Sequence, residues 1–187
     1  MNSGSGFSVT DICMIALFTA LVSVLAQISI PLPGGVPLTM QTMAVFITGI
    51  ILGRRRGFAS LLAYLLLGAF GAPVFSNFGA GLSRLAGPTG GFLLSYPLMA
   101  WIAGYCSEKG GRLQMAAGLL AATLLNYCLG TIMYSFSTKN SIMTSLAACV
   151  LPFVGTDLMK AALAGWMGTL LKKSLRRAGM PVEMQKM

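Results

Sequence analysis

The sequence contains no histidine and few charged side chains. Lys, Arg, Asp and Glu together make up 9% of its 187 residues, and only 4 of these residues are acidic. Soluble domains have about 25% charged residues. Hydrophobic residues make up 56% of this chain, and its mean hydropathy is +0.79. The shortage of charge excludes an ordinary soluble domain, and we expect an all-α integral membrane protein with a single transmembrane domain over residues 1–187.

The missing residue types also exclude several kinds of chemistry. Without histidine, and with one carboxylate expected inside the membrane, the chain offers no metal dyad and no nucleophile with a neighbouring base. Its 4 cysteines show no paired spacing, which argues against a disulfide scaffold or a zinc site. A G-x-x-x-x-G-K-[ST] phosphate loop is missing, so we do not expect the chain to hydrolyse ATP by itself. We therefore predict no enzymatic activity, no metal and no cofactor.

Long apolar segments dominate what is present. A membrane-spanning helix needs about 20 predominantly apolar residues. Six spans are predicted, at about residues 9–30, 40–53, 58–71, 92–106, 113–136 and 152–171. The Gly-rich segment 72–91 is expected to form a long loop, and the short apolar run 141–151 a half-helix at the membrane interface. We expect no signal peptide, because no Lys or Arg precedes the first apolar run and that run is too long.

The basic residues are distributed unequally between the two sides of the membrane. Loops on the cytoplasmic side carry an excess of Lys and Arg. With the N-terminus inside, the outer loops contain only Arg84 and Lys139, and the inner segments contain Arg54, Arg55, Arg56, Lys109, Arg112, Lys172, Lys173, Arg176, Arg177 and Lys186. This distribution predicts cytoplasmic termini and an outer face that carries the Gly-rich loops. It also explains the net charge of +9 without a nucleic-acid partner.

The last predicted span carries two ionisable side chains, Asp157 and Lys160, within an apolar run. A charge at the centre of a spanning helix costs about 2.5–3.5 kcal/mol on insertion scales, so such residues usually face the protein interior. A separation of three residues places both on one helical face. Two interpretations stay open. The two charges neutralise each other, or they face a cavity and bind a solute that has both N–H donors and an anionic group.

Polar and aromatic side chains lie near the outer ends of the predicted spans. Thr39 and Gln41 stand at the start of the second span, and Asn77 lies between two phenylalanines in the long loop. Arg84 is an isolated outer cation, and Tyr96 lies one turn into the fourth span. Such a mixture suits a compact amphipathic ligand. An aromatic belt at the interface and, for Arg84, a lipid headgroup contact are the alternatives.

Four segments in this order resemble the BioY family: "IPLPGGVPLTMQTMAVFITGIILG", "YLLLGAFGAPVFSNFGAG", "GPTGGFL" and "GTDLMKAALA". BioY proteins are the biotin-binding S components of energy-coupling factor (ECF) transporters. The resemblance covers about residues 30–164. It implies six helices, an outward-facing biotin site under a lid formed by the loop between the third and fourth helices, and a location in the cell membrane of a prokaryote. The implied partners are a transmembrane coupling subunit and two ABC-type ATPase subunits.

The family's motifs assign a set of ligand-binding residues in this chain: Asp157, Lys160, Asn77, Thr39 and Gln41. Arg84 and Tyr96 are added to this set because of their position and chemistry. Biotin has a ureido ring with N–H donors and a valerate chain that ends in a carboxylate. The ureido group would meet Asp157 or Asn77, since both carry acceptors. The carboxylate would meet Lys160 or Arg84.

Ala16 and Ala20 lie four residues apart in the first predicted span. In the family that this chain resembles, S components commonly use an A-x-x-x-A pattern to dock on the coupling subunit. Small residues at this spacing permit close helix contact. The alternative is ordinary packing within the bundle. A different function also stays open, namely a self-sufficient secondary transporter or channel for a small carboxylate-bearing solute that uses Asp157 and Lys160.

Overall fold

Most of the described chain is helical, which confirms the predicted class in its general form. The computed structural model describes residues 7–32 and 34–179; Lys186, which was counted for the orientation, lies outside these ranges. The helices in this part are α1 (Val9–Ala26), α2 (Gln41–Ala69), α3 (Leu82–Ala86), α4 (Gly90–Lys109), α5 (Arg112–Thr138), α6 (Ile142–Cys149) and α7 (Val154–Arg177). A 3-10 turn, η1 (Ser76–Phe78), and two short antiparallel strands, β1 (Ser29–Ile30) and β2 (Leu38–Thr39), complete the elements.

Helix α1 is apolar on opposite faces. It begins with a capping box, in which Ser8 accepts a hydrogen bond from the N–H of Asp11 and the Asp11 carboxylate accepts one from the N–H of Ser8. Met14, Phe18 and Val22 are buried at a spacing of four residues, so they form the face that packs on the bundle. The exposed positions are also apolar: Ile12, Leu17, Leu21 and Val24. A helix of this kind suits a position between protein and lipid.

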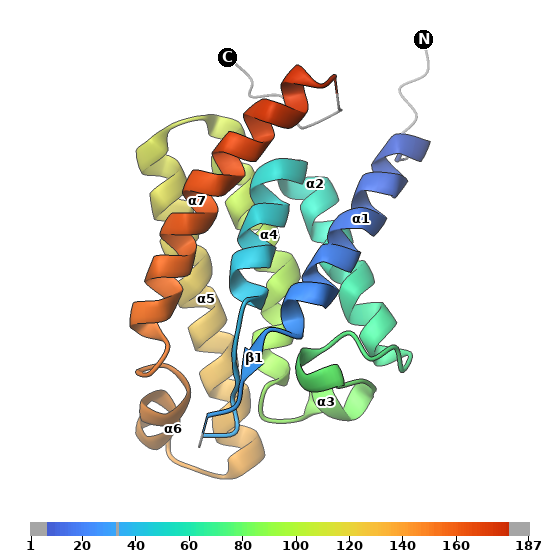
Figure 1. Cartoon of the computed structure of the whole chain (residues 1–187). Helices are drawn as coiled ribbons and strands as arrows, with labels where there is room; N and C mark the ends of the chain where they lie inside the picture. The colour runs from blue at the N-terminus through green and yellow to red at the C-terminus, as the bar shows by residue number, and fades with distance from the viewer. Residues whose placement is uncertain (1–6, 33, 180–187) are drawn as a thin grey trace.

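The chain reverses its direction inside α2, at Gly53. Gly53 has φ 77°, a left-handed conformation that glycine adopts without strain. In an uninterrupted helix, residues 49 and 57 would be about 12 Å apart along the axis. Here a Cβ atom on Gly57 would lie 3.1 Å from the Cα of Gly49. The two halves of α2 are therefore antiparallel (Figure 1), and they correspond to the two segments predicted at 40–53 and 58–71.

Helix α4 packs directly against this reversal. A Cβ atom on Gly104 would collide with the backbone of Gly53 and Arg54. Helix α4 also holds the backbone of the turn. The N–H of Arg54 donates to the Glu108 carboxylate at 2.8 Å, and the Arg54 guanidinium pairs with the same carboxylate at 3.4 Å. Close approach and this ion pair hold the turn of α2 against the end of α4.

Helices α1 and α5 are each long and apolar enough to cross a membrane. Helices α6 and α7 meet at an angle of 54° and would make a third span if the pair is counted as one. This supports a membrane protein, whereas the count of six spans stays a prediction. The halves of α2 are short and flank the arginines at the turn.

Helix α1 ends at Ala26 rather than at the predicted residue 30, because Ser29 and Ile30 pair with Thr39 and Leu38 of β2.

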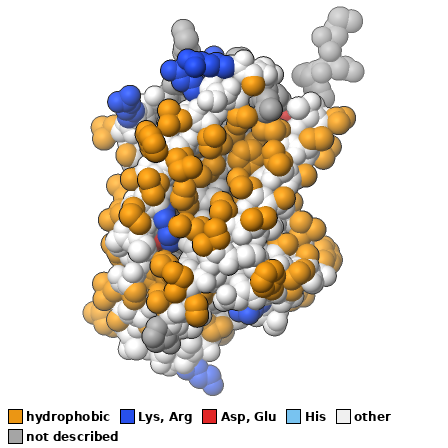
Figure 2. Space-filling model, viewed as in Figure 1, with side chains coloured by type: hydrophobic (Ala, Val, Ile, Leu, Met, Phe, Trp, Pro, Cys, Tyr) orange, Lys and Arg blue, Asp and Glu red, His pale blue; other side chains and the backbone are white. Residues whose placement is uncertain are grey.

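The two ends of the bundle differ. The β1–β2 hairpin, α3 and α6 gather at one end, and the start of α1 and the end of α7 lie at the other (Figure 1). Hydrophobic side chains cover the visible flank, and Lys and Arg side chains gather at the end where α7 ends (Figure 2). The short apolar segment predicted over 141–151 is the helix α6, which begins with Ser141 as its cap.

We expect Gly104→Ala to destabilise the protein, because the added methyl group meets backbone atoms that have no room to move. Overpacking of this kind typically costs about 1–3 kcal/mol. The matched control is Gly155→Ala in α7, where a Cβ atom would meet nothing within 4 Å. Thermal unfolding in detergent should show a lower midpoint for Gly104→Ala and an unchanged or higher one for Gly155→Ala. Equal midpoints would contradict the close packing of α4 on the turn.

Candidate ligand-binding site

A small polar cavity lies between α2, α4, α5 and α7, near the end of the bundle that carries the hairpin. Its volume is about 50 Å³, whereas pockets for small molecules usually have about 300–1,000 Å³. The polar and charged residues in its lining are Thr39, Gln41, Thr42, Ser76, Thr89, Tyr96, Asn126, Tyr127, Asp157 and Lys160, and its apolar wall includes Val36, Phe92 and Phe153. A ligand of the usual size therefore requires the cavity to widen.

The Asp157 carboxylate receives hydrogen bonds from three helices. Its Oδ1 accepts from Lys160 Nζ at 3.0 Å and from the hydroxyl of Thr42 at 3.3 Å. Its Oδ2 accepts from the hydroxyl of Tyr127 at 2.8 Å. The side chains of Asp157 and Lys160 are each 6% exposed. The pair thus forms a mutual ion pair and also lines a cavity, so the two interpretations drawn from the sequence are compatible.

Gln41 is the centre of a second hydrogen-bond network in the cavity. Its side-chain carbonyl accepts from the hydroxyls of Thr39 at 3.1 Å and Tyr96 at 3.4 Å. Its Nε2 donates to the hydroxyl of Tyr64 at 2.6 Å, and Tyr64 donates to the carbonyl of Val74 at 3.0 Å. Val74 belongs to the long segment between α2 and α4. The network therefore connects the cavity with this loop.

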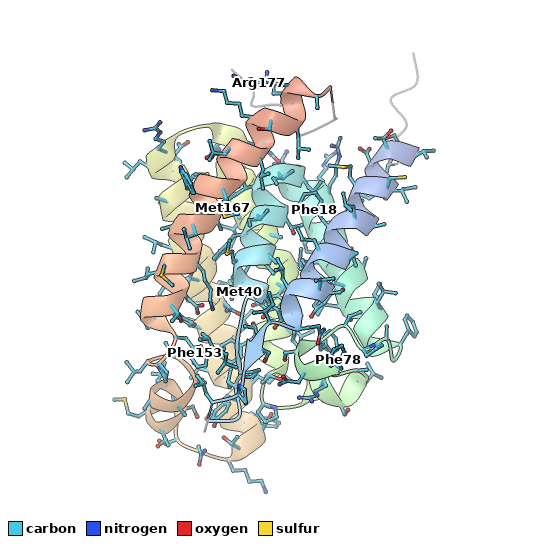
Figure 3. The ribbon with its side chains drawn as sticks, viewed as in Figure 1. Phe18, Met40, Phe78, Phe153, Met167 and Arg177 are labelled. Atoms are coloured by element: carbon cyan, nitrogen blue, oxygen red, sulfur yellow. The ribbon has the colours of Figure 1, made fainter. Side chains whose placement is uncertain are left out.

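The same loop is attached to α1. Gln27 Nε2 donates to the carbonyls of Val74 and Phe75 at 3.4 and 3.2 Å, and its Oε1 accepts from the N–H of Phe78 at 2.9 Å. The Phe75 ring is 1% exposed and meets the Tyr64 ring edge-on at 5.5 Å between centroids. Phe78 and Phe153 lie near the same end of the molecule, opposite Arg177 (Figure 3). The loop is thus fixed to α1 and α2 beside the cavity.

The structure brings together part of the predicted ligand set. The residues in the cavity lining are Thr39, Gln41, Tyr96, Asp157 and Lys160. Asn77 and Arg84 have exposed side chains outside this lining. Asn77 has a left-handed backbone with φ 56°, and the neighbouring Ser76 reaches the cavity instead. Whether Asn77 and Arg84 bind a ligand stays a prediction.

The sequence did not lead us to assign Asn126 or Tyr127 to the site, and both line the cavity. Asn126 accepts a hydrogen bond from the hydroxyl of Ser95 at 2.7 Å, and both side chains are buried. The sequence feature that could have indicated them is the consecutive pair Asn126–Tyr127 in an apolar span, since a polar side chain in a membrane helix usually faces the interior.

In the described ranges, no cluster of three or more His, Cys, Asp or Glu side chains is placed to hold a metal ion.

The predicted docking residues lie on a different surface. Ala16 and Ala20 are exposed on α1. They line an apolar groove of about 550 Å³ together with Ala63 and Leu67 from the second half of α2. Their neighbour Thr19 faces inward, and its hydroxyl lies 3.1 Å from that of Ser60. The two alanines are therefore accessible to another helix, and docking stays a prediction.

These features define a helical membrane protein that encloses a small polar binding site. The sequence model of the BioY family matches residues 1–177, and the chain belongs to this family. A relative from Pyrococcus horikoshii, named a probable biotin transporter BioY, is 40% identical over 82% of this chain and 91% of its own. The biotin transporter BioY of Thermotoga maritima is 39% identical over 84% of this chain and 92% of its own.

A solved structure also resembles this fold. The crystal structure of the S-component for biotin from an ECF-type ABC transporter superposes with a TM-score of 0.81. It is 26% identical in sequence, and the match covers 92% of this chain and 95% of the solved one. The family, the relatives and the fold together establish a role in transport.

We expect the hydroxyl of Tyr127 to contribute more to stability than that of Tyr134, because the acceptor of Tyr127 is a carboxylate. Tyr134, also in α5, donates to the carbonyl of Gly34 at 2.9 Å. Hydrogen bonds to charged groups contribute about 1.5–3 kcal/mol and neutral ones about 0.5–1.5 kcal/mol. Denaturant unfolding of Tyr127→Phe and Tyr134→Phe should show the larger loss for Tyr127→Phe. Equal losses would mean that Tyr127 does not support the buried carboxylate.

Proposed function

We propose that this chain is the biotin-binding S component of an ECF transporter, which captures biotin outside the cell and delivers it inward with a partner ATPase module. The observation that carries the proposal is the buried Asp157–Lys160 pair in the wall of a polar cavity, in a chain of the BioY family. The names of the relatives and the similarity to a solved S-component for biotin support it. The proposal assigns no role to a cofactor, a metal or an enzymatic step.

The chemistry of the cavity fits the two ends of biotin. Lys160 Nζ and Asp157 Oδ1 are only 3.0 Å apart, whereas the valerate chain spans roughly 6 Å, given C–C bonds of about 1.5 Å. The pair therefore meets one end of the ligand. A lysine ammonium has three N–H donors, so Lys160 retains donors after it binds Asp157. We assign the biotin carboxylate to Lys160, and we regard Asp157 as the residue that positions the ammonium.

The ureido ring is then left to the neutral polar groups of the cavity. The amides of Gln41 and Asn126 supply acceptors and donors, and Tyr96 supplies a hydroxyl. Phe92 and Phe153 give the apolar thioether ring a matching wall. Because the cavity has only about 50 Å³, we propose that the segment 70–89 acts as a lid that is displaced when biotin enters.

We further propose a topology of six spans. The spans are α1, the two halves of α2, α4, α5 and α7, and they connect to one another alternately at the two ends of the bundle. Both termini would be cytoplasmic, because the basic residues at the turn of α2 and at the end of α7 would then face the cytoplasm. The lid and the cavity would face the outside. The partners would be a transmembrane coupling subunit and two ABC-type ATPase subunits.

The isolated chain should bind biotin in detergent without nucleotide or added metal. Isothermal titration of the purified protein measures this, and an absence of saturable binding would overturn the proposed function. The same titration tests the orientation of the ligand. Lys160→Ala should weaken biotin about 10- to 150-fold, which corresponds to the 1.5–3 kcal/mol of a charge-assisted hydrogen bond. The amide of biotin, which lacks the negative charge, should lose much less.

The control for this substitution is Lys139→Ala. Lys139 lies at the C-terminal end of α5 outside the cavity lining, so its removal should leave both affinities unchanged. If Lys160→Ala weakened biotin and its amide equally, the ion pair would belong to the ureido end of the site. Biotin binding itself would still stand in that case.

Docking on the coupling subunit is assigned to the groove at Ala16 and Ala20. We expect Ala16→Trp and Ala20→Trp to retain biotin binding by the isolated chain and to lose ATP-dependent uptake in vesicles that contain the partner subunits. A bulky ring prevents close approach of two helices. Leu17→Trp is the matched control, because Leu17 is 62% exposed on α1 but does not line the groove. Normal uptake by both alanine variants would refute the docking role.

A further inference from the structure

A second polar hollow lies at the opposite end of the bundle from the ligand cavity. It has about 350 Å³ and is formed where α4 ends, α5 begins and α7 ends. Four cations line it: Arg112, Lys172, Lys173 and Arg176. Hydroxyl groups of Ser107 and Thr169 also lie in the lining, and Lys172 Nζ donates to the Ser107 hydroxyl at 2.9 Å. The proposed biotin function uses none of these residues.

Arg112, Lys173 and Arg176 of this hollow form no ion pair within the described ranges. Each carboxylate there pairs with a basic residue elsewhere, in the pairs Arg54–Glu108, Arg56–Asp11 and Lys160–Asp157. Arg112 is also the first residue of α5, where the helix dipole disfavours a cation and favours an anion. The positive charges of Arg112, Lys173 and Arg176 repel one another, and a bound anion would relieve this repulsion.

The basic hollow continues into an apolar groove. The groove, of about 630 Å³, runs between α5 and α7 and is lined by Leu119, Leu120, Leu158 and Trp166. Arg112, Met115 and Thr169 line both the hollow and the groove, so the two are continuous. Helices α5 and α7 lie beside each other on one flank of the bundle (Figure 1). The charged and apolar parts are therefore arranged as the headgroup and acyl chain of a lipid are.

We propose that the hollow and the groove form one site for an anionic glycerophospholipid. Its phosphate lies among Arg112, Lys173 and Arg176, and an acyl chain occupies the groove. Basic pockets between membrane helices bind anionic headgroups in this way. The groove distinguishes a lipid from free phosphate, because inorganic phosphate would leave the apolar wall uncovered. The site requires only that the chain lies in a membrane, so it is independent of the proposed biotin function.

Trp166 is a reporter placed in the groove, where its side chain is 65% exposed. The chain has 2 tryptophans, so Trp101→Phe leaves Trp166 as the only one. This variant is reconstituted into phosphatidylcholine nanodiscs that contain a small fraction of lipid with brominated acyl chains, which quench tryptophan on contact. Brominated phosphatidylglycerol should quench Trp166 more strongly than the same fraction of brominated phosphatidylcholine. Equal quenching by the two lipids would overturn the proposal.

Charge substitutions then test the headgroup contacts. A basic residue near an anionic lipid contributes a factor of about five in affinity, so Arg112→Gln with Arg176→Gln should reduce the preference for phosphatidylglycerol roughly 25-fold. The charge-matched control is Arg55→Gln with Arg177→Gln. Arg55 and Arg177 are exposed and do not line the hollow, so this control should retain the preference. An equal loss in both double variants would indicate attraction by net charge alone and would overturn the site.

Two further measurements keep the test decisive. Inorganic phosphate at millimolar concentration should not abolish the preference; if it did, the hollow would be a site for a free anion instead. Native mass spectrometry of the unsubstituted protein, which needs no variant, should retain phosphatidylglycerol on the folded chain at voltages that remove phosphatidylcholine. Simultaneous loss of both lipids would refute the proposal even if a variant failed to fold.

Discussion

A carboxylate inside a membrane bundle requires hydrogen-bond donors, because no bulk water is present to solvate it. Asp157 of α7 obtains them from Thr42 of α2, Tyr127 of α5 and Lys160 of its own helix. Satisfying this one group therefore fixes three helices relative to one another at the level of the cavity. The binding site and the cohesion of the bundle depend on the same contacts. A residue that recognises a ligand here is also part of the packing.

The first half of α2 is fixed at its other end, the turn at Gly53, by a different kind of contact. At the turn around Gly53, α4 approaches so closely that Gly104 has no room for a side chain. This contact places α2 in the middle of the bundle, and residues such as Phe46, Ile50 and Leu52 are fully or almost fully buried. A rigid central helix then presents Gln41 to the cavity, and the Gln41–Tyr64–Val74 hydrogen bonds connect that point with the loop beside it.

The molecule thus has two polar regions separated by an apolar bundle. The cavity end contains a compensated ion pair and neutral hydrogen-bonding groups, which suits a small ligand that is released again. The end near the start of α1 and the end of α7 contains Arg112, Lys173 and Arg176, which form no ion pair within the described ranges, at the edge of an apolar groove. This arrangement suits the proposed lipid. The apolar groove at Ala16 and Ala20 lies on α1 and α2, away from both, so ligand, lipid and partner would not compete for one surface.

The sequence by itself determined the class of protein, the approximate position of the helices and the inward-facing position of Asp157 and Lys160. These follow from local properties: the length of an apolar run, the helical period, and the high cost of a charge within such a run. Only the tertiary structure decided which partners the pair has. Thr42 and Tyr127 are 115 and 30 residues away from Asp157 along the chain, and no local pattern relates them. The exposure of Asn77 and Arg84 was decided in the same way, because the packing of Phe75 and the hydrogen bonds of Gln27 determine which residues of the loop face the cavity.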